Sequence, residues 1–155
     1  MPASTANLGP GFDALGLALG LYNDIEVERT EGETTLTVEG EGAERLQALG
    51  TQNLVSRAVS GTLGKFGKQP TGLRVRMLNR IPLSRGLGSS SAAAMGGVAA
   101  AAALAGVLLS TEELLDLALR SGQYFFVNVH AYCLFEFHFH HDDTTDTTKA
   151  KSRNI

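Results

Sequence analysis

The stretch Pro82-Leu-Ser-Arg-Gly-Leu-Gly-Ser-Ser-Ser-Ala92 decides the fold of this 155-residue chain. It follows a run with the alternation of a β-strand, Leu73 to Leu78, and it precedes a long Ala-rich run that predicts a helix. The first turn of a helix has backbone N–H groups without intrahelical partners, and the helix dipole adds partial positive charge there. A loop of small residues that opens directly into a helix therefore predicts a phosphate-binding site.

Two kinds of residue in this stretch suit phosphate. Gly86 and Gly88 lack a Cβ, so the backbone can take left-handed angles and approach a ligand closely. Ser89 is predicted to be the N-cap of the helix, and Ser89, Ser90 and Ser91 offer hydroxyls to a phosphate or a metal ion. The stretch matches neither GxxxxGK[ST] nor a GxGxxG that opens the helix. The alternative is a Gly/Ser turn that only starts a helix.

Composition and charge argue against several classes of function. The net charge is −3 with both signs interspersed, which gives no electrostatic case for nucleic acid or an anionic membrane. A single cysteine, Cys133, excludes an internal disulfide framework and fits a reducing compartment such as the cytoplasm. The sequence shows no signal peptide. The uncharged run from Ala92 to Leu109 is mostly Ala and Gly, so it predicts a buried helix rather than a membrane span.

Several strands are predicted early in the chain, well before the phosphate loop. Two prolines and two glycines predict a loop from Pro2 to Gly11, and a buried strand is expected from Ala14 to Leu21. Apolar and polar residues alternate in Asp24–Glu28 and again in Thr34–Val38, which predicts a hairpin with one wet face.

Helices are predicted on both sides of the loop. A short helical or irregular link is expected over Glu41–Leu49, and apolar residues at helical spacing predict a helix over Asn53–Phe66. Ser110 and Glu113 form a capping box that starts a further helix. Strands mixed with helices in this order fit a two-layer fold with the helices on one face of a sheet.

Four arginines surround the predicted phosphate loop. Arg74, Arg76, Arg80 and Arg85 could form a basic patch near bound phosphate. For Arg74 and Arg76 we favour the simpler interpretation, a solvated strand face, whereas Arg85 lies inside the loop itself.

A second polar stretch lies near the start of the chain. Ser4, Thr5, Asn7 and Asp13 surround a predicted loop beside a predicted strand, which suits a polar pocket. Asn7 and Asp13 would also suit a structural turn, because both residue types bond their own backbone locally. Residue spacing alone leaves both interpretations open.

Together the two stretches resemble the motifs of the GHMP small-molecule kinases. The loop resembles the ATP loop of that superfamily, and P-A-S-T-A-N-L-G-P-G-F-D, which ends at Asp13, resembles the opening motif of its homoserine kinase branch. The resemblance covers about Pro2 to Arg120. It implies an α+β fold, the GHMP kinase N-terminal domain of ribosomal protein S5 domain 2-like type, with a mixed sheet and helices on one face. It also implies that the C-terminal half and one N-terminal strand are missing.

The resemblance implies ATP-dependent phosphorylation of the side-chain hydroxyl of L-homoserine to O-phospho-L-homoserine, a step of threonine biosynthesis, with ATP and Mg²⁺. Asn7 and Asp13 match family residues that contact the amino-acid substrate; a carboxylate can pair with its ammonium group. Asn53 matches a family residue near the adenine, although capping of its helix also explains it. No general base is evident. The implied ATP-binding residues are Asn53, Pro82, Leu83, Ser84, Arg85, Gly86, Leu87, Gly88, Ser89, Ser90, Ser91 and Ala92, with Ser90 as the Mg²⁺ ligand.

From about Ser121 the sequence changes character. All four His, the single Cys and five of the seven Phe follow this point. We therefore divide the chain into 1–120, the kinase-like ATP-binding domain, and 121–155, a divergent tail. The family continues here with Glu-Gly-His-Pro-Asp-Asn-Val, and neither its Glu, a magnesium ligand, nor its His has a counterpart. Our hypothesis for the tail is a shifted reading frame or another artefact, which sequencing of the coding region would test.

The tail also admits other interpretations. Its His and Asp residues could bind a transition metal, although no rigid frame for such a site is evident; they are His138, His140, His141, Asp142 and Asp143. Thr144 to Ile155 is polar and lacks periodicity, which predicts disorder. Apolar surface left open by the missing half predicts self-association, with a homodimer as one form.

Three alternatives to a homoserine-phosphorylating enzyme remain at this point. The first is a GHMP kinase for a different small alcohol, against which the opening motif argues. The second is a catalytically inactive ATP-binding fragment, which the missing Glu and C-terminal half favour. The third is a metal-binding module built on the tail. A substrate panel, an ATP-binding measurement and a metal-dependent stability measurement would separate them.

Overall fold

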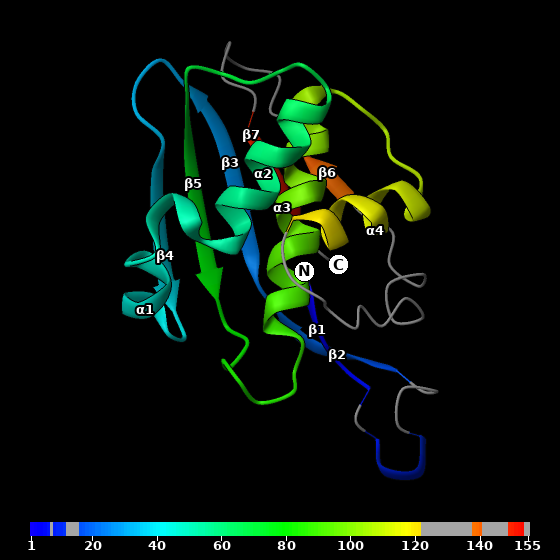
Figure 1. Cartoon of the computed structure of the whole chain (residues 1–155). Helices are drawn as coiled ribbons and strands as arrows, with labels where there is room; N and C mark the ends of the chain where they lie inside the picture. Colours follow the sequence, from blue (N-terminus) through cyan, green and yellow to red (C-terminus); the bar gives the residue numbers. More distant parts are fainter. Residues whose placement is uncertain (7, 12–15, 122–137, 141–148, 154–155) are drawn as a thin grey trace.

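A computed structural model of the chain describes residues 1–6, 8–11, 16–121, 138–140 and 149–153 (Figure 1). Strands and helices are mixed along this part of the chain. The strands are β1 (Pro2–Thr5), β2 (Leu17–Tyr22), β3 (Asp24–Thr30), β4 (Thr35–Gly40), β5 (Gly72–Asn79), β6 (His138–His140) and β7 (Lys149–Arg153). The helices are α1 (Ala43–Gln47), α2 (Leu54–Lys65), α3 (Ser89–Ala105) and α4 (Thr111–Arg120), with 3₁₀ turns at Gly9–Gly11 and Gly50–Gln52.

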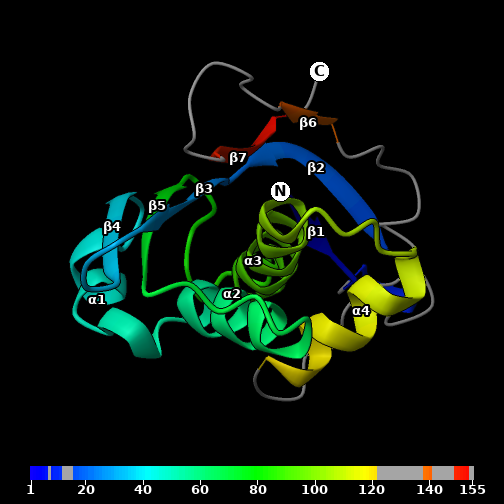
Figure 2. The ribbon, with the colours of Figure 1, turned by 90° about the horizontal axis from the view of Figure 1, so that it is seen from above.

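The fold has two layers, a mixed sheet and a layer of helices. The larger sheet has five strands in the order β4-β5-β3-β7-β6, and β1 pairs with β2 in a separate two-stranded ribbon. Strand β5 runs antiparallel to β3 and parallel to β4. Seen from above, α2, α3 and α4 all lie on one side of the sheet (Figure 2). The predicted α+β architecture, a mixed sheet with helices on one face, is confirmed.

The predicted hairpin between β3 and β4 is wrong. Both strands form where the alternation placed them, but β5 lies between them and pairs with each. Val75 of β5 faces Val27 of β3 on one side and Leu36 of β4 on the other. Alternation determines which face of a strand is buried, but it carries no information on which strand becomes its neighbour. The strand between β3 and β4 can therefore come from a later part of the chain, beyond α1 and α2.

The start of the chain also differs from the prediction. Pro2–Thr5 forms strand β1 instead of a loop, because a proline at the first position of an edge strand removes no ladder hydrogen bond. Strand β2 is not buried as predicted: none of its residues is fully buried, and Leu17 is 50% exposed. Within the two-stranded ribbon, β1 is the buried strand, whereas β2 is only partly covered.

Helix α3 lies at the centre of the fold and is buried as predicted. All of its residues except Ser90 and Ala103 are buried. Its small side chains allow its neighbours to approach closely: a Cβ on Gly97 would lie 2.8 Å from the Cβ of Ala58 on α2. Among the residues that the structure describes, α3 included, no helix combines the length and apolarity needed to cross a membrane.

Both ends of α3 have distinct polar surroundings. At the C-terminal end, the Arg29 guanidinium donates to the carbonyl of Leu104 at 3.0 Å, and the Lys68 ammonium donates to the carbonyl of Ala105 at 2.5 Å. Two cations thus stabilise the negative end of the helix dipole and satisfy two terminal carbonyls. The N-terminal end carries the predicted phosphate loop.

The other helices and the tail complete the comparison with the prediction. Helix α2 and the capping box of α4 are confirmed, and a short α1 occupies the predicted link. The prediction of disorder over 144–155 is wrong for β7, whose backbone pairs with β3. His141, Asp142 and Asp143 lie outside the described residues, and within the described ones no group of metal-ligating side chains occurs.

Candidate phosphate-binding site

The loop between β5 and α3 is built on left-handed backbone. Three of its residues have positive φ, with values of 58° at Ser84, 70° at Gly86 and 69° at Gly88. Ser84 is the one residue other than glycine with positive φ in the part of the chain that the structure describes. Such a conformation is uncommon for a residue with a Cβ, and it occurs most often at functional sites.

The N-cap of α3 is Gly88, so the prediction of Ser89 is wrong. A capping serine needs extended backbone angles, whereas the chain enters α3 through the left-handed Gly88, and Ser89 is already the first helical residue. No side-chain cap hydrogen bond is present, and the first intrahelical bond runs from the Ala92 N–H to the Gly88 carbonyl at 2.9 Å. The N–H groups of the preceding serines are therefore left for a ligand.

The three serines of this first turn differ in exposure. Ser89 and Ser91 are buried, at 9% and 7% exposure, whereas Ser90 is exposed. Only the hydroxyl of Ser90 is thus open to a phosphate or to a metal ion carried by one. This exposure agrees with the role predicted for Ser90, which itself stays a prediction.

Two buried asparagines hold the entry of the loop. The Asn23 carboxamide oxygen accepts from the backbone N–H groups of Arg80 at 2.8 Å and of Ile81 at 3.1 Å. Asn79 donates from its side chain to the Glu41 carbonyl at 2.6 Å. Both asparagines have no exposed surface. We did not identify either asparagine from the sequence. The signal that could have indicated this role is a single Asn at the start or end of an alternating apolar run.

The middle and the end of the loop are held from two sides. The Ser4 N–H of β1 donates to the Leu87 carbonyl at 3.0 Å. On the other side, Leu83 packs against Gly42, the left-handed residue at the N-terminus of α1, where a Cβ would collide with the leucine side chain. The loop is therefore held between β1 and α1, which restricts its conformation.

The remaining predicted site residues have different placements. Asn53 is buried and caps α2, accepting from the Val55 N–H at 2.9 Å and donating to the Leu46 carbonyl at 3.0 Å. These bonds give it a structural role, and its contact with adenine stays a prediction. Asn7 and Asp13 lie outside the described residues.

The arginines near the loop are largely engaged elsewhere. Arg80 pairs with Asp24 at 3.0 Å, and Arg74 pairs with Glu28 at 2.9 Å on the open face of the sheet. The simpler interpretation of Arg74, a solvated strand face, is confirmed. Arg85 is exposed within the loop, and its contact with a phosphate stays a prediction.

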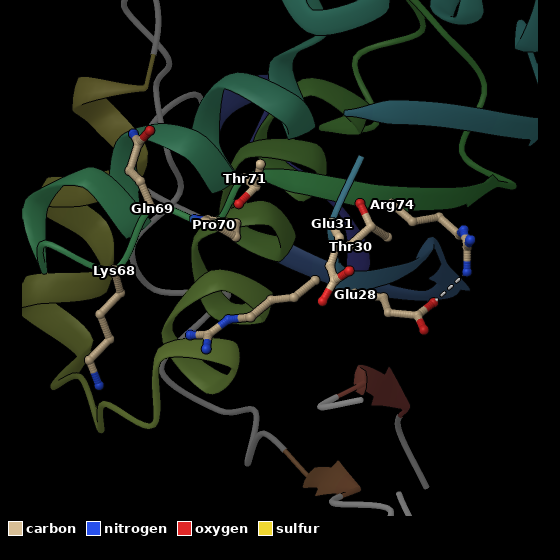
Figure 3. A pocket seen from close by; sticks show the side chains of 9 residues that line it. Glu28, Thr30, Glu31, Lys68, Gln69, Pro70, Thr71 and Arg74 are labelled. Carbon is tan, nitrogen blue, oxygen red and sulfur yellow. Dashed lines mark hydrogen bonds and ion pairs between the residues drawn. The ribbon is translucent and has the colours of Figure 1, made fainter. Parts of the chain in front are cut away.

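A large cavity lies away from this loop. It has a volume of about 870 Å³ and is lined by residues of β3, of the start of β5 and of the turn between α2 and β5 (Figure 3). The Glu28–Arg74 ion pair lies on its wall, and Lys68 and Arg29, which also line it, donate to the end of α3. Because β5 runs from this cavity toward the loop, the two are at opposite ends of the strand.

A two-layer α+β domain in which an inner strand, β5, leads through a left-handed Gly/Ser loop into a buried helix has the architecture of a small-molecule kinase domain. The chain belongs to the GHMP kinase family: the family model for the GHMP kinases N terminal domain matches residues 53–134. The predicted family is thereby confirmed, and with it the class of enzyme, a kinase.

Relatives and solved structures agree with this assignment. The chain is 55% identical over 123 residues to a homoserine kinase of Mycobacterium tuberculosis and 50% identical over 118 residues to one of Corynebacterium aurimucosum, covering 75% and 76% of this chain. It spans 38% of the length of each of these relatives.

Among solved structures, homoserine kinase from Cytophaga hutchinsonii matches with a TM-score of 0.61 and 30% identity, over 77% of this chain and 38% of that one. The mevalonate kinase of Methanococcus jannaschii has the same TM-score at 22% identity, over 77% and 44% of the two chains. The second match bears on the fold alone.

Proposed function

We propose that this chain binds MgATP at the loop from Pro82 to Ala92 and takes part in phosphorylation of the side-chain hydroxyl of L-homoserine, giving O-phospho-L-homoserine. The observation that carries the proposal is the uncapped N-terminus of α3, held behind a left-handed loop. Identity of about half to proteins named homoserine kinase supports the choice of acceptor. The step would belong to cytoplasmic threonine biosynthesis, as the family resemblance implies.

The roles proposed for the loop follow from the chemistry of phosphoryl transfer. Catalysis of this reaction consists mainly of positioning and of charge neutralisation on the transferred phosphoryl group. The backbone N–H groups of the first turn of α3 would hold phosphate oxygens, and the exposed Arg85 would add positive charge. The contacts of the loop with β1 and α1 lower the cost of ordering it when the nucleotide binds.

Magnesium fits this loop as an ion that the nucleotide brings with it. Mg²⁺ prefers oxygen ligands and is bound mainly by substrate phosphates, waters and few protein groups. The exposed Ser90 hydroxyl is a suitable oxygen, and the loop itself, from Pro82 to Ala92, contains no carboxylate. When bound, the ion would neutralise charge between the phosphates.

Acceptor binding would depend on the opening motif. We propose that Asp13 pairs with the ammonium group of L-homoserine and that Asn7 bonds its hydroxyl or carboxylate, by the family match alone. No side chain is assigned as general base. Association into a homodimer is likewise a proposal.

A second candidate function is an ATP-binding fragment without turnover. The specific observation that favours it is the coverage: the chain spans 38% of the length of its relatives, so residues that those enzymes use can lie beyond the match. Such a fragment would bind MgATP, but homoserine would not cause ADP to form.

Thermal unfolding with and without ligands separates these functions. MgATP at about 100 times its dissociation constant should stabilise the folded chain by roughly 2.7 kcal/mol. A further rise with L-homoserine, together with homoserine-dependent ADP formation, would support the kinase. A rise with MgATP alone would support the fragment, and no rise with either ligand would refute both.

Matched variants locate the binding at the loop. Ser90→Ala removes the exposed hydroxyl of the first turn of α3 and should reduce the MgATP-induced rise. Thr51→Ala removes an exposed hydroxyl from the 3₁₀ turn before α2 and should leave the rise unchanged. An equal effect of the two substitutions would place the nucleotide elsewhere.

A further inference from the structure

Strand β1 is attached to the phosphate loop by backbone. The Ser4 N–H donates to the Leu87 carbonyl at 3.0 Å, although the two residues are far apart in the sequence. Leu87 lies two residues before the first residue of α3, and Ser4 lies three residues before Asn7 in the sequence. The first residues of the opening motif are therefore joined directly to the loop proposed to hold the nucleotide.

The two segments also approach each other more closely than a side chain would allow. A Cβ built on Gly88 would lie 2.6 Å from the Ser4 Oγ, 3.0 Å from its carbonyl oxygen and 3.4 Å from its nitrogen. Ser4 is 6% exposed, so its hydroxyl is confined in the gap. Steric room at this point requires glycine, in addition to the positive φ of 69°.

Another glycine of the same loop separates these two requirements. Gly86 has a φ of 70°, almost identical to that of Gly88, but a Cβ built on it meets no atom within 4 Å. Backbone conformation alone therefore explains Gly86, whereas Gly88 also serves the contact with β1. The chain thus contains its own control for that contact.

We propose that the Ser4–Gly88 contact couples the acceptor alcohol to the nucleotide, with Ser4 and Gly88 as positioning residues. The proposal rests on the function proposed above. Because β1 and the loop share this contact, a ligand that orders one segment favours the ordered form of the other. Such coupling would hold the hydroxyl at the distance from the phosphoryl group that in-line transfer needs, where displacements of about 1 Å can cost 100-fold in rate.

The test measures coupling between two ligands on the full chain. The affinity of Mg²⁺ with the non-hydrolysable analogue AMP-PNP is measured by calorimetry without and with saturating L-homoserine. We expect homoserine to increase this affinity about fivefold or more, the lower end of typical couplings. Gly86→Ala and Gly88→Ala should both weaken analogue binding, because both place a Cβ at positive φ.

The two variants should differ in the coupling ratio, which is the affinity of the analogue with homoserine divided by its affinity without homoserine. A purely structural defect of the loop would weaken binding in both conditions and would not change this ratio selectively. We expect Gly86→Ala to keep the increase caused by homoserine and Gly88→Ala to bring it close to onefold. Ser4→Ala added to Gly88→Ala removes the atom at 2.6 Å and should restore part of the ratio. If Gly88→Ala alone does not fold, the coupling ratio is measured on the double variant.

Each outcome is decisive. If the parent chain does not bind the analogue, the proposed function fails and the coupling with it. If homoserine binds the parent chain in a separate titration but does not alter the affinity of the analogue, or if both alanine variants keep the same ratio, the coupling proposal alone is overturned. Loss of the ratio in Gly88→Ala with partial recovery in the double variant would support it.

Discussion

The carboxamide oxygen of Asn23 accepts a hydrogen bond from the backbone N–H of Ile81 at 3.1 Å, which joins the corner between β2 and β3 to the residue that precedes the phosphate loop. The same oxygen accepts from the Arg80 N–H at 2.8 Å. One side chain without exposed surface therefore satisfies two consecutive backbone donors where β5 ends. A corner of the sheet thus determines where the loop begins.

Asn23→Ala should destabilise the fold more than Asn79→Ala. The first substitution leaves two backbone N–H groups without an acceptor, and each such group costs about 1–3 kcal/mol when buried. The second removes one bond, to the carbonyl of the exposed Glu41, which water can replace, so we expect a loss of about 1 kcal/mol. Urea unfolding at equilibrium measures the loss in the free energy of unfolding for each variant. Because both substitutions remove the same kind of side chain, the difference between the two losses reports the hydrogen bonds. Equal losses would contradict this role of Asn23.

Elements with a local signature could be predicted from the sequence. The helix from Asn53 has a capping side chain and apolar spacing, and the helix from Ser110 has a capping box; both form as predicted. The buried face of β5 follows from the alternation of Leu73, Val75 and Met77. In each case, residues within one or two turns determine the structure.

Features that depend on distant partners could not be predicted. The place of β5 between β3 and β4 depends on pairing between strands that α1 and α2 separate in the sequence, and local alternation carries no record of it. Gly88 was not recognised as the N-cap, because Ser89 is the better N-cap by residue type, and the close approach of Ser4 to Gly88 comes from a distant part of the chain. Asn23 is of a residue type that is common in turns, and only the fold shows which backbone groups it bonds.

Gln47 of α1 protects the exposed edge of β4, and its loss should cause association. Its side-chain oxygen accepts from the Val38 N–H and its side-chain nitrogen donates to the Leu36 carbonyl, both at 2.7 Å. The amide thus occupies the positions of a neighbouring strand at the edge of the sheet. Gln47→Ala should cost about 1–2 kcal/mol for two bonds and raise the weight-average mass at high concentration in sedimentation experiments.

Gln52→Ala is the control for that substitution. Gln52 is exposed in the 3₁₀ turn before α2, and no hydrogen bond of its side chain is recorded in the structure. We expect neither stability nor mass to change. Association of both variants to the same extent would show that edge protection by Gln47 is unimportant.

Two glycines in helices should respond to alanine with opposite signs. Gly61 lies in α2 with no atom within 4 Å of a built Cβ, so Gly61→Ala should stabilise by about 1 kcal/mol through helix propensity. A Cβ on Gly97 of α3 would lie 2.8 Å from the Ala58 Cβ and 3.0 Å from the Val55 carbonyl oxygen. Overpacking of this kind lowers the free energy of unfolding by about 1–3 kcal/mol, because the neighbouring backbone cannot move away at low energetic cost. We therefore expect Gly97→Ala to lower the melting temperature. Stabilisation by both substitutions would mean that α2 and α3 are not tightly packed.

The capping box of α4 should make stability depend on pH in the acid range. Glu113 accepts from the backbone N–H of Ser110 at 2.9 Å, and this bond, followed by the hydrogen bond with the Ser110 side chain, lowers the pKa of Glu113 below its ordinary value of 4.5. A pKa that is lower in the folded state stabilises the fold above the unfolded pKa, and the contribution is lost as pH falls through the folded pKa.

Glu113→Gln should therefore lower the melting temperature at pH 7 but not in strong acid. Glutamine can still accept the bond in a capping box, so the difference from the parent reports the charge. We expect this difference to be constant above about pH 6 and to shrink as pH falls below 4.5, because the parent carboxylate then becomes protonated. Glu112→Gln removes a charge from the same exposed first turn but no recorded bond to the cap, so it is the control for the loss of charge near the helix dipole. If melting curves across this pH range show the same profile for the two variants, the helix dipole rather than the Ser110 bond stabilises the carboxylate.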